Sequence, residues 1–494
     1  MDTTIRPQFK FDNSFARSME GFFSYCQAES ANTPRWLQFN HALAEELGLD
    51  PVALDSEAGL AIFSGNATPE GSQPIAQAYA GHQFGGFSPQ LGDGRALLLG
   101  EVVDTKQQRR DIQLKGSGRT PFSRGGDGKA AIGPVLREYL VGEAMQALGV
   151  PTTRALAAVA TGNDVYRETV LPGAILTRVA ASHIRVGTFQ YAAARRDEDK
   201  IRQLADYSIQ RHYPETANAE NPYLAFFAAV ADAQASLVAR WMGIGFIHGV
   251  MNTDNMTISG ETIDYGPCAF MDSYSASTVF SSIDHGGRYA YANQPEMLIW
   301  NLARLAETLI PLVDSKQEKS VQLLTEIIES IQPLYESYWL TVMRAKIGLS
   351  TEDPSDSQLI KDLLKTMEKG NADFTMVFRR LSKALRGDSE LVRGLFKNPD
   401  DFDAWEQRWW NRFERDGISA ETSAQMMDNL NPIYIPRNHK VEEALAAAKD
   451  RQDLIPFKKL LNVLTTPFDE LEGSEDYAEP APPNEIPYKT FCGT

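Results

Sequence analysis

The stretch His248-Gly249-Val250-Met251-Asn252-Thr253-Asp254-Asn255, with Asp264-Tyr265-Gly266 after it, decides the expected fold and site. Asn255 and Asp264 offer an amide oxygen and a carboxylate, and such oxygen ligands favour Mg²⁺ or Mn²⁺. A second carboxylate, Asp254, directly precedes Asn255. These three side chains make the stretch a candidate metal-dependent site.

The spacing of this stretch is typical of a protein-kinase catalytic loop. In kinases a His-Arg-Asp sequence precedes a Mg²⁺-binding Asn, and a later Asp-Phe-Gly supplies the second metal ligand. His248 and Asn255 keep that interval, and Asp264-Tyr265-Gly266 stands in for Asp-Phe-Gly. Val250 occupies the position of the kinase Asp and has no group that can accept a proton. The sequence therefore predicts a kinase-like site that keeps its metal ligands and lacks its usual base.

The composition limits the classes of partner. The chain has 494 residues, long enough for two domains or one elaborated core, and 43% of them are hydrophobic. Its 48 basic and 65 acidic side chains give a net charge of −17. Because this charge repels polyanions, we expect neither nucleic acid nor a membrane surface as the main partner.

Targeting and redox signals favour a cytoplasmic protein. The N-terminus lacks the apolar run of a signal peptide, and no run of about 18 apolar residues predicts a membrane span. Three widely spaced cysteines, Cys26, Cys268 and Cys492, form neither a zinc motif nor a disulfide framework.

The N-terminal half contains the elements of a phosphate-binding lobe. Residues 96–103 and 111–115 read as two strands joined by a charged turn, and the second ends at Lys115, as in a kinase N-lobe. Glycines of the preceding Gly92-Asp93-Gly94-Arg95 would let backbone N–H groups approach a polyphosphate, although such a sequence is more often an ordinary turn. The glycine-rich segment 116–129 carries three cations and predicts a mobile flap.

A helix and a strand after the flap add further candidates. The helix has Pro134 in its first turn and Gly149 at its C-terminal cap. Glu138 lies outside its apolar stripe and could pair with Lys115, although most helical glutamates are only solvated. Arg178 on the expected strand 174–179, and Arg185 after it, carry guanidinium groups that match phosphate geometry.

The sequence predicts an α+β, protein-kinase-like bilobal fold with a β-rich N-lobe and an enlarged α-helical C-lobe. Residues 33–47 predict a helix, 257–263 predict a hairpin between the two metal ligands, and the chain from 295 onward reads as mostly helical. We expect five segments: an N-terminal extension over 1–70, an N-lobe over 71–190, a C-lobe core over 191–290, a helical extension over 291–466 and an acidic flexible tail over 467–494.

Together these motifs resemble the selenoprotein O family. The resemblance rests on Ala80 to Gly85, Leu91 to Arg95, His248 to Gly266 and Tyr434 to His439, and covers most of the chain. It implies a kinase-like enzyme that binds ATP in a reversed orientation and transfers AMP to Ser, Thr or Tyr hydroxyls of proteins. UMP transfer from UTP, favoured by Mn²⁺, is also implied. A reversed nucleotide would bring the α-phosphate to the acceptor and would explain the missing kinase base.

The resemblance also implies roles for single residues. Asp254 resembles the proton acceptor, Asn255 and Asp264 resemble the metal ligands, and Glu138 resembles the partner of Lys115. Asp264 also resembles a nucleotide contact. The full set that resembles nucleotide contacts is Gly92, Gly94, Arg95, Lys115, Asp127, Gly128, Arg178, Arg185 and Asp264. Cys492 stands where some members have selenocysteine, which leaves open a redox role of the tail with Cys268.

Two other functions stay open at this stage. One is transfer of the γ-phosphate by an ordinary kinase with Asp254 as a relocated base, which Val250 disfavours. The other is a nucleotide-binding scaffold without catalysis, which has no need of both Asn255 and Asp264.

Overall fold

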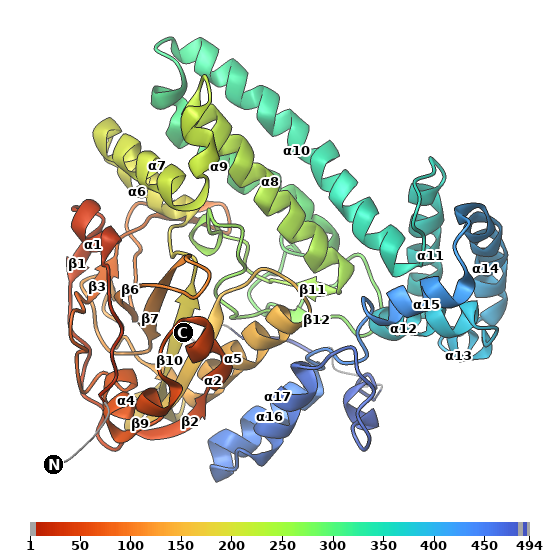
Figure 1. Ribbon diagram of the computed structural model, residues 1–494, viewed down its shortest axis with the longest axis horizontal. Coiled ribbons are helices and arrows are strands. Elements are labelled where there is room, and N and C mark those ends of the chain that lie inside the picture. The colour runs from red at the N-terminus through yellow and green to blue at the C-terminus, as the bar shows by residue number, and fades with distance from the viewer. Residues whose placement is uncertain (1–5, 483–487, 492–494) are drawn as a thin grey trace.

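The computed structural model describes residues 6–482 and 488–491, and it combines an antiparallel sheet with many helices (Figure 1). The sheet has eight strands in the order β1-β3-β6-β7-β10-β9-β2, with β8 paired to β10. Their bounds are β1 Phe23–Tyr25, β2 Arg35–Phe39, β3 Ile75–Gln77, β6 Ala96–Val103, β7 Arg109–Lys115, β8 Ala130–Ala131, β9 Arg154–Tyr166 and β10 Val170–Ala180.

The two strands predicted before the flap are present. β6 is buried along all but its last residue, as expected from its run of leucines, and it pairs antiparallel with β7, which ends at Lys115. In the turn between them, the Asp104 carboxylate accepts hydrogen bonds from the backbone N–H groups of Lys106 and Gln108. Lys115 therefore lies at the end of a strand in the middle of the sheet.

Residues 33–47 do not form the predicted single helix. They form strand β2, which pairs with β9, followed by a short helix α2, His41–Glu46, which Asn40 caps by accepting from the N–H of Leu43. Trp36 and Phe39 on β2 pack against Phe63. The pairing with β9 overrides the helical pattern, and residues before 70 thus complete the sheet.

Helix α5, Ile132–Ala147, lies between the sheet and two C-terminal helices, α16 Asn438–Arg451 and α17 Ile455–Leu464 (Figure 1). It packs on β9 and β10 with one face and on α16 and α17 with another. Tyr139 of α5 contacts Phe457 of α17 edge to face. Because both faces are covered, α5 is fixed relative to the sheet.

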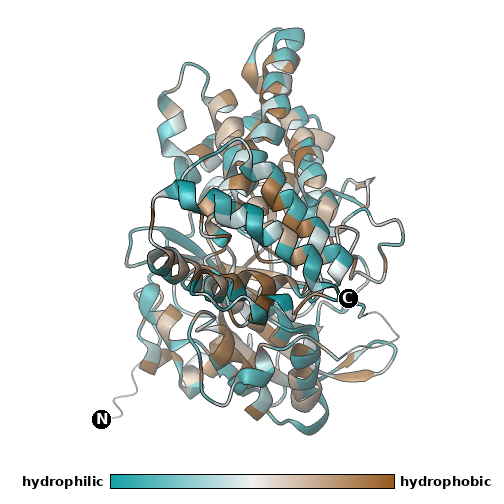
Figure 2. Cartoon of the chain, turned by 90° about the vertical axis from the view of Figure 1, so that its right-hand side faces the viewer, coloured by the Kyte–Doolittle hydropathy of each residue, from teal (hydrophilic) through white to brown (hydrophobic). Residues whose placement is uncertain are grey.

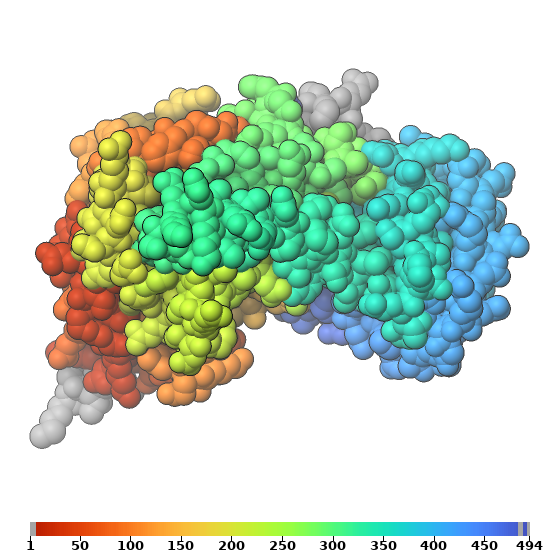
Figure 3. All heavy atoms as spheres, turned by 90° about the horizontal axis from the view of Figure 1, so that it is seen from above, coloured from red at the N-terminus to blue at the C-terminus, as the bar shows by residue number. Residues whose placement is uncertain are grey.

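Besides the short N-terminal helices α1 Ser14–Ser18, α3 Pro51–Leu54 and α4 Glu57–Phe63, the remaining α-helices form a layer beside the sheet and an extension at one end of the long axis (Figures 1 and 3). Figure 2 shows hydrophilic and hydrophobic residues mixed along the helices that face the viewer, which is typical of helices packed on one side. Those beside the sheet are α6 Val186–Ala194, α7 Glu198–His212, α8 Pro222–Gly243, α9 Gln294–Val313 and α10 Gln317–Lys346. Those of the extension are α11 Asp356–Gly370, α12 Phe374–Leu385, α13 Glu390–Arg393, α14 Pro399–Phe413 and α15 Ala420–Asp428.

Helix α8 is by length and composition apolar enough to cross a membrane, which the sequence prediction overlooked. Half of its most apolar window is buried inside the protein, and it packs against α9 and α10. Core helices of soluble proteins pass the same test, so this feature is weak evidence for a span.

Part of the segment predicted to be a flexible tail packs on the protein. Thr490 pairs with Ser281, and its N–H donates to the Phe280 carbonyl at 2.8 Å. The ring of Tyr488 contacts that of Phe280. Cys492 lies outside the described residues.

Candidate active site

Eleven of the twelve predicted site residues line one cavity of about 440 Å³ between the sheet and the catalytic loop. They are Gly92, Gly94, Arg95, Lys115, Asp127, Gly128, Arg178, Arg185, Asp254, Asn255 and Asp264. The twelfth, Glu138, lies behind Lys115 on α5 and is buried. Residues from positions 92 to 264 of the sequence therefore come together around one cavity.

Lys115 joins the sheet to both carboxylates of the site. Its ammonium lies 2.6 Å from Oε2 of Glu138 and 2.9 Å from Oδ1 of Asp264. Burial alone would raise the pKa of Glu138, but the adjacent Arg178 and Lys115 hold that pKa below its ordinary value. The Lys115–Glu138 pair that the resemblance implies is therefore present.

Two buried arginines bond the Asp264 carboxylate, and one of them also bonds Glu138. Arg178 donates from Nε to Oε1 of Glu138 at 2.8 Å and from Nη2 to Oδ1 of Asp264 at 2.6 Å. Arg185 donates from Nη1 to Oδ2 of Asp264 and to the Asp254 carbonyl, both at 2.6 Å. Three cations thus surround Asp264 and hold its pKa well below the ordinary value against the opposite effect of burial. This concentration of cations at a cavity wall suits a polyphosphate.

Asp264 sits in a strained backbone conformation. Its φ of 62° lies in the left-handed region, which is uncommon for residues other than glycine. The following Gly266 donates its N–H to the Asp264 carbonyl at 2.8 Å, and His248 contacts the carbonyl of Ile263 at 2.9 Å through Nε2. These contacts fix the carboxylate toward the cavity, and such strain is frequent at functional sites.

The donor set at Asn255 and Asp264 fits a hard divalent cation. Asn255 donates its Nδ2 to the Val250 carbonyl at 3.1 Å, which leaves the amide oxygen as its ligand atom. Within residues 6–482 and 488–491, no group of three or more His, Cys, Asp or Glu side chains is arranged to hold a metal. Mg²⁺ at nucleotide sites usually takes one or two carboxylates, phosphate oxygens and water, so two protein ligands suffice.

Asp254 is a buried carboxylate that lines the cavity directly before Asn255. It is 7% exposed, and burial raises its pKa to about 6, with Arg185 opposing that rise. Its Oδ2 accepts a hydrogen bond of 3.1 Å from Nε2 of Gln83, whereas the buried Oδ1 has no hydrogen-bond partner. Val250 lines the same cavity, so the position of the kinase base is apolar.

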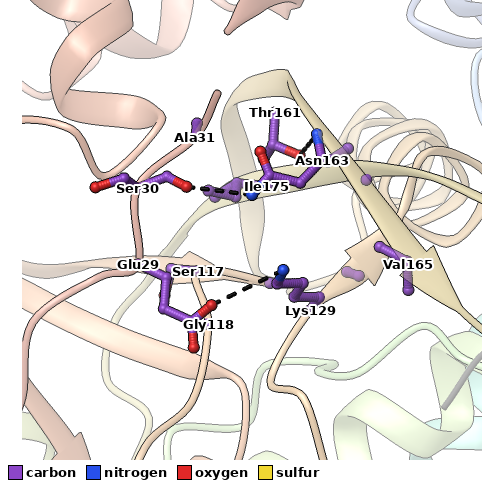
Figure 4. Close-up of a pocket in the computed structure, with 14 residues that line it drawn as sticks. Glu29, Ser30, Ala31, Ser117, Gly118, Lys129, Thr161, Asn163, Val165 and Ile175 are labelled. Carbon is purple, nitrogen blue, oxygen red and sulfur yellow. Dashed lines mark hydrogen bonds and ion pairs between the residues drawn. The ribbon is translucent and has the colours of Figure 1, made fainter. Parts of the chain in front are cut away.

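The segment 116–129 is closed at its base. Ser117 pairs with Lys129, and Gly118 donates its N–H to the Gly128 carbonyl at 3.0 Å. Glu29 lies against this base and points toward Lys129 beside a small cavity (Figure 4). It also accepts from the N–H of Arg119 at 3.1 Å. The N-terminal extension therefore anchors the flap.

The glycines before β6 have a packing role. A Cβ at Gly92, where φ is 105°, would lie 2.5 Å from Cγ of Phe122, and one at Gly94 would lie 3.0 Å from the Phe122 carbonyl. Glycine is needed at Gly92 because the flap residue Phe122 packs directly on it, and the close Phe122 carbonyl disfavours a larger residue at Gly94. This close contact is a reason for the glycines that the sequence does not reveal.

Several residues of the cavity were missed by the sequence prediction. They are Tyr79, Gln83, Phe84, Asp93, Arg124, Lys129, Arg167, Asn252 and Ile283. Among them Arg167 has the clearest structural role, because its guanidinium donates to the Asp127 carboxylate at 2.8 and 3.1 Å and to the Lys129 carbonyl at 3.1 Å. It lies in a surface turn between β9 and β10, where nothing in the sequence marks it.

The predicted hairpin over 257–263 is wrong. A turn is present, since Thr257 Oγ1 donates to the carbonyl of Glu261 and accepts from its N–H. The flanking residues pair elsewhere, Thr257 with Arg185 and Thr262 with Thr152. Backbone pairing with two other segments therefore replaces the local strand pairing and fixes the position of this loop.

Cys268, four residues after Asp264, is fully buried and free. Burial raises the pKa of its thiol to about 11, and the nearby Arg137 opposes that effect in part. Its proposed partner Cys492 lies outside the described residues.

Comparison with known proteins places this chain in a family. The family model described as "Protein adenylyltransferase SelO" matches residues 6–465. A protein of Cereibacter sphaeroides strain KD131 named "Protein nucleotidyltransferase YdiU" is 60% identical over 488 residues, which are 98% of this chain and all of that protein. Proteins of the same name from Rhizobium rhizogenes strain K84 and Agrobacterium fabrum strain C58 are 58% and 56% identical, over 99% and 98% of this chain and 97% and 100% of their own. The chain therefore belongs to the protein adenylyltransferase SelO family and is an enzyme of the nucleotidyltransferase class.

Proposed function

We propose that this protein transfers AMP from ATP to Ser, Thr or Tyr hydroxyls of acceptor proteins and releases pyrophosphate. The observation that carries the proposal is a division of roles among the charged groups of the cavity. Lys115, Arg178 and Arg185 surround the Asp264 carboxylate, whereas within the described residues the Asp254 carboxylate bonds none of these cations and its Oδ1 has no hydrogen-bond partner. A cationic wall suits the leaving pyrophosphate, and a lone carboxylate suits an acceptor hydroxyl.

The reaction follows from this division. The acceptor oxygen attacks the α-phosphorus, the bond from that phosphorus to the bridging oxygen of the β-phosphate breaks, and the hydroxyl proton passes to Asp254. Lys115, Arg178 and Arg185 stabilise the charge that develops on the pyrophosphate. Mg²⁺ or Mn²⁺ bound by Asn255 and Asp264 would neutralise phosphate charge when present.

The same arrangement supports a reversed nucleotide. With the β- and γ-phosphates near the three cations, the α-phosphate lies nearer the acceptor side, and a base at the Val250 position is not required. We also propose Asp127 and Gly128 of the flap, and Gly92, Gly94 and Arg95, as nucleotide contacts, because all five line the cavity. UTP is a second candidate donor, since the proposed contacts hold phosphates and not a base.

We further propose that the chain has the bilobal protein-kinase-like arrangement. The Lys115–Glu138 pair, the helix α5 that carries Glu138, and the loop with Asp264 support it. We also propose that the protein acts in the cytoplasm on protein acceptors, and that neither nucleic acid nor a membrane is its partner. This proposal rests on the charge and composition of the chain.

The test is an incubation with a protein acceptor, Mg²⁺ or Mn²⁺, and ATP labelled at either the α- or the γ-phosphate. We expect label on protein only from α-labelled ATP, and none with Asp264→Ala. Asp254→Asn should still bind ATP and fail to transfer. Label retained only from γ-labelled ATP would instead establish a kinase with Asp254 as relocated base. ATP binding without label from either position would establish a scaffold. Labelled UTP in a parallel reaction compares the two donors.

A further inference from the structure

A short hairpin lies over the catalytic loop. Its strands are β4, Gly81–Gln83, and β5, Gly86–Ser88, and the two turn residues Phe84 and Gly85 have φ of 51° and 85°. Left-handed conformations at both turn positions are typical of a tight two-residue hairpin. The sequence prediction gave this segment no role.

The hairpin is attached to the catalytic loop by two hydrogen bonds. The N–H of His82 donates to Oγ1 of Thr253 at 2.7 Å, and the N–H of Phe84 donates to Oδ1 of Asn252 at 3.0 Å. The same Asn252 oxygen accepts from the Tyr289 hydroxyl at 2.6 Å. Gln83, between the two attached residues, is thereby held in one place relative to the adjacent Asp254.

Gln83 combines an exposed position with a buried partner. The residue is exposed, yet its Nε2 lies 3.1 Å from Oδ2 of Asp254, which is 7% exposed. Within the described residues, no other side chain donates a hydrogen bond to this carboxylate, and its Oδ1 has no partner. Arg185 bonds the backbone carbonyl of Asp254 instead of its carboxylate. The orientation of the Asp254 side chain thus depends on Gln83.

We propose that Gln83 is a positioning residue that holds the Asp254 carboxylate toward the acceptor hydroxyl at the open side of the cavity. This inference rests on the proposed function. Gln83 lines the cavity together with Phe84 and Ile283, which are 37% and 50% exposed, so it lies at a solvent-exposed edge of the cavity that an acceptor protein can reach. Within the described residues its side chain bonds Asp254 and none of Lys115, Arg178 and Arg185, so its loss should affect acceptor transfer while leaving ATP binding intact.

Glutamate and leucine substitutions separate this role from a structural one. Gln83→Glu keeps size, polarity and exposure but replaces the N–H donor by a carboxylate that repels Asp254. Gln83→Leu removes the donor without adding charge. For an exposed side chain with only a structural role, Gln83→Glu is the milder change, whereas a positioning role makes it the more damaging one. Gln90→Leu, an exposed glutamine of the next turn, is the matched control.

The experiment measures kcat and KM for acceptor labelling from α-labelled ATP, and ATP affinity by calorimetry. We expect kcat to fall by about tenfold in Gln83→Leu and further in Gln83→Glu, since general base catalysis contributes about 10²–10⁴-fold. ATP affinity should stay within about twofold in both variants because the cationic wall is intact, and Gln90→Leu should match the wild type.

The opposite outcomes are distinguishable. Wild-type kcat in Gln83→Glu, or a parallel loss of ATP affinity, would overturn the role of Gln83 while leaving AMP transfer established. An absence of α-label on the acceptor with the wild-type enzyme would overturn the proposed function and this inference together.

Discussion

Nη2 of Arg178 lies 2.6 Å from Oδ1 of Asp264, so an arginine of β10 pairs directly with a carboxylate of the loop after the catalytic loop. Arg178 is 1% exposed and also bonds Glu138 of α5. One guanidinium therefore joins the sheet, the helix and the loop. Removing it would leave buried carboxylates with fewer partners, which is costly.

Arg178→Met should accordingly lower the free energy of unfolding by about 3–5 kcal/mol. Chemical denaturation followed by tryptophan fluorescence measures this change. The control is Arg408→Met, which breaks the 2.8 Å pair with Asp362 but alters a side chain that is 52% exposed. The control should cost no more than about 1 kcal/mol. Equal losses in the two variants would show that the buried pair is not a structural link.

Asn255→Ala should weaken metal activation. The amide oxygen of Asn255 is one of the two protein ligands that we propose for the metal, and phosphate and water should not fully replace it. We expect the Mg²⁺ concentration for half-maximal activity to rise by about tenfold or more, with partial recovery at high Mn²⁺. A titration of activity against each metal measures this, and an unchanged Mg²⁺ requirement would remove Asn255 from the ligand set.

Gly81→Ala should reduce turnover. A Cβ at Gly81 would lie 2.8 Å from Oδ1 of Asp254, so the carboxylate or the hairpin must move. Misplacement of a catalytic group by about 1 Å can cost about 100-fold in rate, and we expect a loss of that order in kcat with normal ATP affinity.

Gly86→Ala in the same hairpin is the control, because its nearest contact would be 3.5 Å from the Gln83 carbonyl. Steady-state measurements of kcat and of KM for ATP in both variants test this prediction. Full activity in Gly81→Ala would mean that Asp254 need not keep the observed position.

Arg167→Ala should release the flap. Its guanidinium holds both the Asp127 carboxylate and the Lys129 carbonyl, and the hydrogen bonds from Arg167 are the main cause of the lowered pKa of Asp127. We expect KM for ATP to rise by about tenfold while kcat changes by less than about threefold, because the flap carries the nucleotide contacts proposed at Asp127 and Gly128 and Asp254 is untouched. Arg167→Lys should lie between, since an ammonium cannot bond both groups in a fork. A loss confined to kcat would contradict this role.

Lys346 should make stability depend on pH. Burial lowers its pKa from 10.5 to about 7, although the Phe378 ring lies 4.5 Å from the ammonium and favours its charge. Between about pH 7 and 10.5 the unfolded chain binds more protons at this residue than the folded chain, so the free energy of unfolding from this source rises with pH. Below about pH 7 both states are charged and the dependence ends.

The measurement for this prediction is denaturation at pH 7 and at pH 9 in the wild type and in Lys346→Met. The rise with pH should be smaller in Lys346→Met, and the exposed Lys365→Met should behave as the wild type. The same rise in Lys346→Met as in the wild type would show that this lysine is not the group responsible.

Strong local patterns were enough for part of the fold and site. The leucine run of β6, the strand ending at Lys115 and the helix α5 were predicted from apolar patterns and from the proline and glycine at the helix ends, and the structure has them. The helix predicted over 33–47 failed because pairing of β2 with β9 outweighs local propensity. The hairpin over 257–263 failed because both of its ends pair with distant segments.

The sequence by itself determined which groups the site can offer: the candidate metal ligands Asn255 and Asp264, the apolar Val250, and the cations at 115, 178 and 185 follow from residue type and spacing along the chain. Only the tertiary structure decided that Gln83 holds Asp254, that Arg167 ties the flap and that Glu29 supports its base. Those partners are 90 to 171 residues apart or lie in unmarked turns. Local sequence encodes local conformation, whereas contacts between distant segments arise only when the whole chain packs.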